Sequence, residues 1–331
     1  MKKPALEKIK EFGKLLWDAI NGFLEDGCMR MSASLAYYTV FSIGPILLIL
    51  IWALGFFYGN HLEGPNGAKA EVMEELYGLF GKDIALMLDS AIQKISLENR
   101  TSIGVIIGVV TLIITSTTIF IDIQVSINQI WQVKPKPKKG WVKLIVNRLI
   151  SFSMILGLAF VLMVSLVVSS IIGALTDQIL QLFGGINIEL IEWINSAITF
   201  AVIAALFGFI FAFLPDAKVR FKDILGGALF TAILFMLGKY GISYYLTNNA
   251  TASSYGAAGT IIILLSWIYY SSAILYFGAE FTKEYAIKYG RGVRPSSFAV
   301  LVKQTEVQID VETGTKEVIK KHNEDAIPDK V

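Results

Sequence analysis

The chain has 331 residues, of which 54% are hydrophobic and 17% charged, with a formal net charge of +2 and a mean hydropathy of +0.60. Soluble domains carry about 25% charged residues, so this composition indicates a membrane protein. The single cysteine, Cys28, and the eight prolines exclude a disulfide scaffold, a multi-cysteine metal site and a collagen-like chain.

The first 25 residues predict an amphipathic helix over residues 5–25. Its apolar side chains recur at helical spacing, and lysines lie between or before them. Two arrangements fit this pattern. The helix lies on the cytoplasmic leaflet, where anionic lipid attracts the lysines, or it packs beneath a helical bundle. The apolar positions are Leu6, Ile9, Phe12, Leu16, Ile20 and Phe23.

Six longer segments are apolar enough to cross a bilayer, because about 20 apolar residues in a helix span its hydrocarbon core. Helices are expected, since unpaired backbone groups in lipid are costly. We therefore predict an all-α, polytopic membrane protein with six transmembrane helices plus amphipathic interfacial helices. The predicted spans cover about 38–58, 102–121, 149–173, 196–214, 224–245 and 256–281.

The distribution of lysine and arginine predicts the orientation of these spans. Twenty-four of the 29 lie in residues 1–37, 122–148, 215–223 and the segment from 282 onward. The segments on the other side carry four, all within 59–101. Both termini are therefore expected in the cytoplasm. Residues 1–290 form the expected membrane domain, and residues 291–331 are polar enough to predict a largely disordered cytoplasmic tail.

Four blocks of the sequence together resemble one family. These are SASLAYYTVFSIGP at 32–45, NQIW at 128–131 with the apolar run from 147, LPDAKVRFKDILGGALFTAIL at 214–234, and YGAAGTIIILLSWIYYSSAILYFGAEFT at 255–282. In this order they resemble the YihY/virulence factor BrkB family, formerly labelled ribonuclease BN, over roughly residues 10–290. The resemblance implies six membrane helices and a bacterial cytoplasmic (inner) membrane.

Ionisable residues at span ends are costly in a membrane and are candidates for function. Asp122 follows the second span, Glu280 ends the sixth, and Arg30 and Arg148 precede the first and third. Two acids and two bases at one depth predict an ion-pair cluster, with Asn128 further along the helix of Asp122. We favour a structural clamp over a substrate or proton site for this group.

Three further positions complete the candidate polar pathway. Lys239 lies near the outer end of the fifth span, where a lysine that extends to the interface is the simpler interpretation and an anionic headgroup contact is the alternative. Tyr269 lies near the middle of the sixth span, where its hydroxyl needs a partner. Pro45, preceded by Gly44, is expected to kink the first span.

The sequence favours transport over catalysis. Its two histidines, His61 and His322, fall on opposite sides of the predicted membrane, so they cannot form one metal site, and phosphate-binding loops are absent. We expect no enzyme activity, no cofactor and no specific nucleic acid. The expected function is ATP-independent translocation of a lipidic or amphipathic substrate, and the alternative is a non-transporting envelope scaffold. Membrane lipids are the expected partners, and an oligomer is left open.

Overall fold

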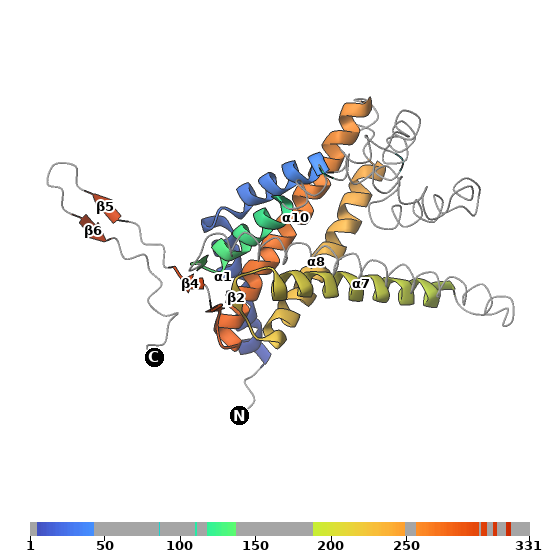
Figure 1. The fold of residues 1–331 in the computed structure, drawn as a ribbon. Helices are drawn as coiled ribbons and strands as arrows, with labels where there is room; N and C mark the ends of the chain where they lie inside the picture. The colour runs from blue at the N-terminus through green and yellow to red at the C-terminus, as the bar shows by residue number, and fades with distance from the viewer. Residues whose placement is uncertain are drawn as a thin grey trace.

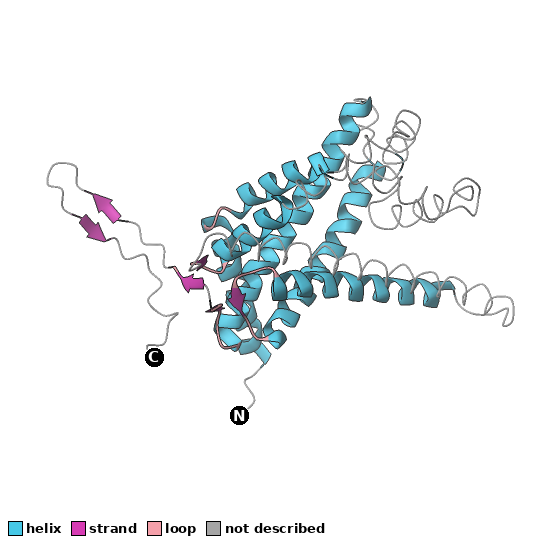
Figure 2. Cartoon of the chain, viewed as in Figure 1, coloured by secondary structure: helices cyan, strands magenta, loops and turns pink. Residues whose placement is uncertain are grey.

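The computed structural model describes residues 5–42, 86, 110, 118–136, 188–248, 256–297, 299–302, 307–309 and 316–318. Helices dominate this part of the chain, and strands occur as short pairs (Figures 1 and 2). Helix α1 spans Ala5–Glu25 and confirms the predicted N-terminal helix. Two further helical stretches cover residues 28–42 and 118–130.

A turn of two residues, Asp26 and Gly27, separates α1 from the next helix. Gly27 has a φ of 69°, a left-handed conformation that glycine adopts without a steric penalty. The amide of Gly27 donates to the carbonyl of Leu24, and the amide of Met31 donates to the carbonyl of Gly27. The second helix therefore starts directly after this turn.

Three long helices form the rest of the framework. Helix α7 spans Ile188–Phe213, α8 spans Phe221–Asn248 and α10 spans Gly256–Tyr289. Pro215 follows α7 and disfavours helical conformation at Leu214, so the chain turns there. Ser196–Phe213 and Phe221–Gly241 are long and apolar enough to cross a membrane. These two segments agree with the fourth and fifth predicted spans.

The other predicted spans are described only in part. Helix α10 contains the whole predicted sixth span but continues past residue 281 to Tyr289. Only the first residues of the predicted first span are described, as the end of the helix over 28–42. Most of the second span and all of the third lie outside the described residues. Two membrane-length apolar helices are therefore found in the described part of the chain, compared with six predicted.

Short antiparallel strands modify the predicted all-α class. Strand β1 (Val133–Pro135) pairs with β4 (Ala299–Leu301), and β2 (Ala217–Lys218) pairs with β3 (Arg294–Pro295). Strands β5 (Val307–Ile309) and β6 (Lys316–Val318) pair with each other. The predicted disordered tail from Arg291 is thus corrected for residues 294–295 and 299–301, which pair with the loops after α7 and after the 118–130 helix. The sequence did not reveal this pairing, because strands of two or three residues are too short to show an alternation of apolar and polar side chains.

Helices α8 and α10 pack closely because small residues of each face side chains of the other. Gly227 lies against Thr282, and Gly278 lies against Thr231, so that a Cβ atom at either glycine would overlap the opposite threonine. The hydroxyls of these threonines bond to carbonyls of their own helices, at Gly227 for Thr231 and Gly278 for Thr282. This reciprocal arrangement brings the two backbones together, as in other membrane helix pairs.

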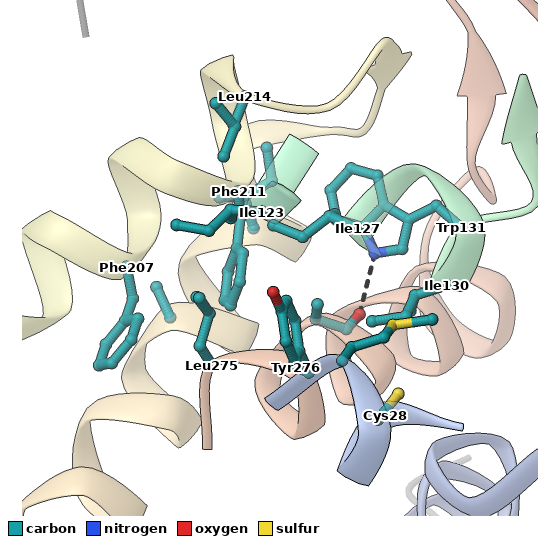
Figure 3. Close-up of a cluster of buried hydrophobic side chains, with 14 of the residues drawn as sticks. Cys28, Ile123, Ile127, Ile130, Trp131, Phe207, Phe211, Leu214, Leu275 and Tyr276 are labelled. Atoms are coloured by element: carbon teal, nitrogen blue, oxygen red, sulfur yellow. Dashed lines mark hydrogen bonds between the residues drawn. The ribbon is translucent and has the colours of Figure 1, made fainter. Parts of the chain in front are cut away.

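A hydrophobic core joins the helices over 28–42 and 118–130 to α7, α8 and α10 (Figure 3). Trp131 is almost fully buried in it, and its indole Nε1 donates to the carbonyl of Ala279 over 2.9 Å. Buried tryptophans usually satisfy their N–H in this way. The bond fixes the end of the 118–130 helix against α10. The labelled members in Figure 3 are Cys28, Ile123, Ile127, Ile130, Trp131, Phe207, Phe211, Leu214, Leu275 and Tyr276.

Candidate functional site

A buried group of charges lies where α1 meets α10. We call it the acid–lysine cluster, and its members are Asp26, Glu280, Lys283 and Glu284. Glu280 is fully buried and forms an ion pair with Lys283 one turn later on the same helix. The Nζ of Lys283 also lies 3.7 Å from Oδ2 of Asp26 and 3.9 Å from Oε1 of Glu284. One ammonium group therefore faces three carboxylates.

The packing of α1 encloses this cluster. The two helices are antiparallel, because Phe23 contacts Phe277 while the Nζ of Lys288 donates to the carbonyl of Glu11. Gly22 lies directly against the carboxylate of Glu280, and a Cβ at this position would overlap it. The absence of a side chain at Gly22 therefore leaves the space that Glu280 occupies.

Burial and charge shift the pKa values around Lys283. Burial by itself lowers the pKa of the Lys283 ammonium, but the neighbouring carboxylates raise it above its ordinary value. Burial raises the pKa of Asp26 and of Glu284, and Lys283 only partly counters this effect. Repulsion from Asp18 and Asp26 adds to the shift at Glu284. The cluster thus holds more negative charge than its one lysine neutralises, which favours proton uptake by its acids.

A second group of polar side chains continues from the cluster between three helices. We call it the polar seam, and it comprises Ser34, Asp122, Ser126, Tyr276 and Glu280. The hydroxyl of Ser34 lies 3.4 Å from Oδ1 of Asp122. Asp122 and Ser126 share one face of their helix, as Tyr276 and Glu280 do on α10. Tyr276 is buried and lies close to Ser126 and Asp122.

Among the described residues, two carboxylate oxygens of the polar seam have neither a hydrogen-bond nor an ion-pair partner. These are Oδ2 of Asp122 and Oε2 of Glu280. A buried polar atom without a partner costs about 1–3 kcal/mol, and such atoms in a native structure call for an explanation. Binding of a proton, an ion or a polar group of a substrate would satisfy them.

Asp216 forms a separate buried network beside the polar seam. Its Oδ2 accepts from Asn128 Nδ2 at 2.9 Å and its Oδ1 from Gln124 Nε2 at 3.3 Å. The amide of Asp216 donates to Asn128 Oδ1 at 2.8 Å, and its carbonyl accepts from the amide of Ser296 at 3.0 Å. Asp216 therefore links the 118–130 helix, the loop after α7 and the segment before β4. This geometry is that of a structural clamp.

The predicted ion-pair cluster differs from the observed one. Glu280 pairs with Lys283, whereas Arg30 is exposed and Asp122 is bonded to Ser34. The expected pairing assumed that residues at one depth meet, but the side chain three positions along the same helix reaches Glu280 first. Arg148 and Pro45 lie outside the described residues, so the structure does not place them.

Sequence reasoning missed Lys283 and Asp216. The i,i+3 spacing of Glu280 and Lys283 was a usable signal for the first. The amides Gln124 and Asn128, four residues apart on one helix face, indicated an acceptor for the second but not its identity. Asn128 was predicted as part of the polar pathway, and the structure places it in the Asp216 network.

Lys239 and Tyr269 are both half-buried on their helices, and neither is part of the acid–lysine cluster. The neighbouring Tyr270 donates its hydroxyl to the carbonyl of Leu234 at 3.2 Å. A mid-span tyrosine hydroxyl is thus paired with the backbone of α8. Among the described residues, no group of three or more His, Cys, Asp or Glu is arranged to hold a metal ion.

Comparison with known proteins identifies the family. The family model described as "Virulence factor BrkB" matches residues 19–298. The chain belongs to this family. Relatives named "UPF0761 membrane protein" include one from Alcanivorax borkumensis, 28% identical over 280 residues, or 83% of this chain and 60% of the relative. One from a Psychrobacter species is 30% identical over 269 residues, or 79% of this chain and 46% of the relative.

This BrkB-family chain is a membrane protein, as its relatives' names and its two membrane-length helices indicate. A Pseudomonas paraeruginosa relative is 26% identical over 81% of this chain and 61% of its own length. The chain thus spans about half to three fifths of the length of these relatives. No solved structure matches the chain.

Proposed function

We propose that this chain translocates a lipidic or amphipathic substrate across the bacterial cytoplasmic membrane without ATP hydrolysis. In this proposal it crosses the membrane with six helices, has both termini in the cytoplasm, and catalyses no covalent reaction. The observation that carries the proposal is the polar seam, in which the fully buried Glu280 and the half-buried Asp122 lie between helices of a membrane protein. Charged residues inside membrane helices are rare, and in transporters they bind ions, protons or substrate headgroups.

The polar seam offers a means of coupling to a gradient. Within the described part of the chain, Asp122 and Glu280 each keep one carboxylate oxygen unpaired, and Glu280 belongs to a cluster whose acids outnumber its lysine. Neutralising one of these carboxylates removes a charge from the space between the 28–42 helix, the 118–130 helix and α10. Loss of this charge by protonation favours closer packing of the three helices. The helices would then have two arrangements, one with the carboxylate protonated and one with it charged.

Lys239 is the proposed contact for an anionic headgroup. It lies on membrane-length α8, where a positive charge in the outer third would meet a lipid phosphate at reduced dielectric. Asp122 and Lys239 therefore have different proposed roles, one in coupling and the other in substrate binding. Substitutions at the two sites should separate these roles.

The test is translocation of a fluorescent anionic phospholipid in proteoliposomes of the purified chain. Asp122→Asn keeps the shape and the Ser34 contact, and we expect it to reduce the pH dependence of the rate while the protein stays folded. Lys239→Met is expected to lower the rate for anionic more than for zwitterionic lipid. Lys222→Met is the matched control, because Lys222 is exposed near the start of the same helix. Absence of protein-dependent translocation in the wild type would refute the proposal.

The alternative is a scaffold without transport, and the Asp216 network favours it. All the donors and acceptors described at Asp216 are paired within the chain, as expected where polar groups fix one conformation. If the chain is a scaffold, Asp122→Asn should change both the thermal stability of the protein and its binding to partner proteins. Transport predicts that the same variant alters flux without loss of thermal stability.

A further inference from the structure

One face of α1 is apolar but is not packed against the rest of the described chain. Five positions, at residues 9, 13, 17, 20 and 24, follow one another around one side of the helix. Four of them are large apolar side chains with high exposure, and Gly13 has no protein atom near its Cβ position. We call these four the α1 stripe: Ile9 at 69%, Trp17 at 63%, Ile20 at 40% and Leu24 at 59%.

The opposite side of α1 already has its partner. Leu15 and Ala19 are buried against Phe281 of α10, with Phe230 of α8 beside them. The apolar surface of α1 is therefore wider than the part that packs on the bundle, and the remaining part, the α1 stripe, is turned outward. A helix packed only beneath a bundle needs no apolar surface beyond its packed face, so the α1 stripe has a different partner.

Charge identifies that partner. The helical positions next to the α1 stripe, beyond Trp17 and Leu24, are occupied by Lys10, Lys14 and Asn21, and both lysines are exposed. An apolar stripe with tryptophan at its edge and lysines along one border matches the acyl and headgroup layers of an anionic leaflet. Basic residues near such a surface are attracted to its anionic lipids.

The location of α1 supports the same partner. Helix α8 exposes an apolar row at intervals of four residues, Phe221, Leu225, Leu229, Ile233 and Leu237, on a helix long enough to cross a bilayer. Because Phe230 of α8 packs beside Leu15 and Ala19 on the other side of α1, α1 lies next to a helix of membrane-crossing length. An exposed apolar surface of this kind on a membrane protein is expected to meet lipid.

We propose that α1 is held by the membrane as well as by α10: the α1 stripe inserts into the leaflet that α1 adjoins, and Lys10 and Lys14 contact anionic headgroups. The two arrangements expected from the sequence, contact with the leaflet and packing beneath the bundle, then hold together on two sides of the same helix. This binding does not depend on transport.

Spin labels on the full-length chain in nanodiscs of phosphatidylglycerol and phosphatidylcholine test this proposal. Labels are placed at Ile20→Cys and Leu24→Cys in the α1 stripe, with Glu7→Cys and Glu25→Cys on the exposed polar face as matched controls. Cys28→Ala removes the native thiol. Collision rates with oxygen and with a water-soluble nickel chelate are then measured at each position.

We expect an oxygen-to-nickel collision ratio several-fold higher at residues 20 and 24 than at 7 and 25. The ratio should fall when phosphatidylcholine replaces phosphatidylglycerol, or when Lys10 and Lys14 are changed to Gln. Equal ratios at all four positions would overturn lipid insertion. Low collision rates with both reagents at 20 and 24 would also overturn it, since they would place another protein surface on the stripe. A ratio insensitive to both lipid charge and the lysine changes would overturn the headgroup contact.

Discussion

Lys283 is the residue on which the acid–lysine cluster depends. Its ammonium group faces Glu280, Asp26 and Glu284, so Lys283→Met leaves three carboxylates facing one another in a buried space. Removing one partner of a buried ion pair costs about 3–5 kcal/mol. We expect a loss of this size in thermal unfolding at neutral pH, with Lys222→Met, at an exposed site on α8, close to wild type.

The stability lost in Lys283→Met should be partly restored by a second substitution. Adding Glu280→Gln to Lys283→Met removes one of the unbalanced charges, so the double variant should regain part of the lost stability. If Lys283→Met unfolds like the wild type, the cluster does not contribute to stability, and its charges must be neutralised in another way.

Glu284 allows the pH dependence to be tested. Its pKa is raised by burial, so the folded state favours the protonated acid. Stability from this group is therefore fully present below the ordinary pKa of 4.5 and is lost as pH rises through the higher folded value. We expect Glu284→Gln to unfold at higher temperature than wild type at pH 8, with the difference shrinking towards pH 4.5. A difference that grows on acidification would show the opposite shift.

Cys28 should be unreactive in the folded protein. Its side chain is fully buried, and burial together with the nearby Glu280 and Asp26 raises the pKa of its thiol to about 12. Alkylation requires an accessible thiolate. Iodoacetamide at pH 8 should therefore leave the native chain unmodified and add one group to the denatured chain, as measured by mass spectrometry. Rapid labelling of native protein would show that α1 detaches from α10.

At the residue scale, position and charge sufficed to select Glu280 and Asp122 from the sequence but not to find their partners. Glu280 is noticeable as an acid at the end of an apolar run, and this needs no tertiary information. Its partner Lys283 could have been found from the i,i+3 spacing on the same helix. The contact with Asp26 does not, because it depends on the antiparallel docking of α1, which also requires Gly22.

Among the helices, α8 and α10 carry the sharpest test of packing. Gly227→Ala places a methyl group against Thr282, whereas Gly241→Ala on the same helix meets no atom within 4 Å. Overpacking typically costs about 1–3 kcal/mol, and a glycine in an open helical position gains up to about 1 kcal/mol on becoming alanine. Thermal unfolding in detergent should therefore fall for Gly227→Ala and stay equal or rise for Gly241→Ala. Equal effects would mean that the two helices are not in close contact.

Strong periodicity made some elements predictable. The N-terminal helix was predicted over 5–25 and is observed as Ala5–Glu25, because its apolar residues recur over many turns. The strands that hold residues 294–301 were not predicted. They are two or three residues long and depend on backbone pairing with loops distant in sequence, which leaves no local pattern in the chain.

On the scale of the whole molecule, four distant segments meet at one end of the helices. Strands β1 and β4 join the loop after residue 130 to residues 299–301, and β2 and β3 join the loop after α7 to residues 294–295. The side chain of Gln129 donates to the carbonyl of Asp26, which follows α1. These segments belong to the four regions that hold 24 of the 29 lysines and arginines. The pairing supports, by an independent route, the prediction that they share one side.

The shared side can be assigned by labelling in intact cells. Positively charged segments are retained in the cytoplasm, so this end of the bundle should face inward. Lys218→Cys replaces the exposed residue of β2, and Ser253→Cys lies in the segment between α8 and α10, both in a Cys28→Ala background. A membrane-impermeant maleimide added to whole cells should label residue 253 and not residue 218, with both labelled after permeabilisation. The reverse pattern would invert the orientation, and labelling of both in intact cells would show that α8 does not cross the membrane. Because β2 and β3 are paired, a label confined to the inside at residue 218 also places residues 294–295 in the cytoplasm, and it puts the end of α10 that carries the acid–lysine cluster on the cytoplasmic side of the bundle.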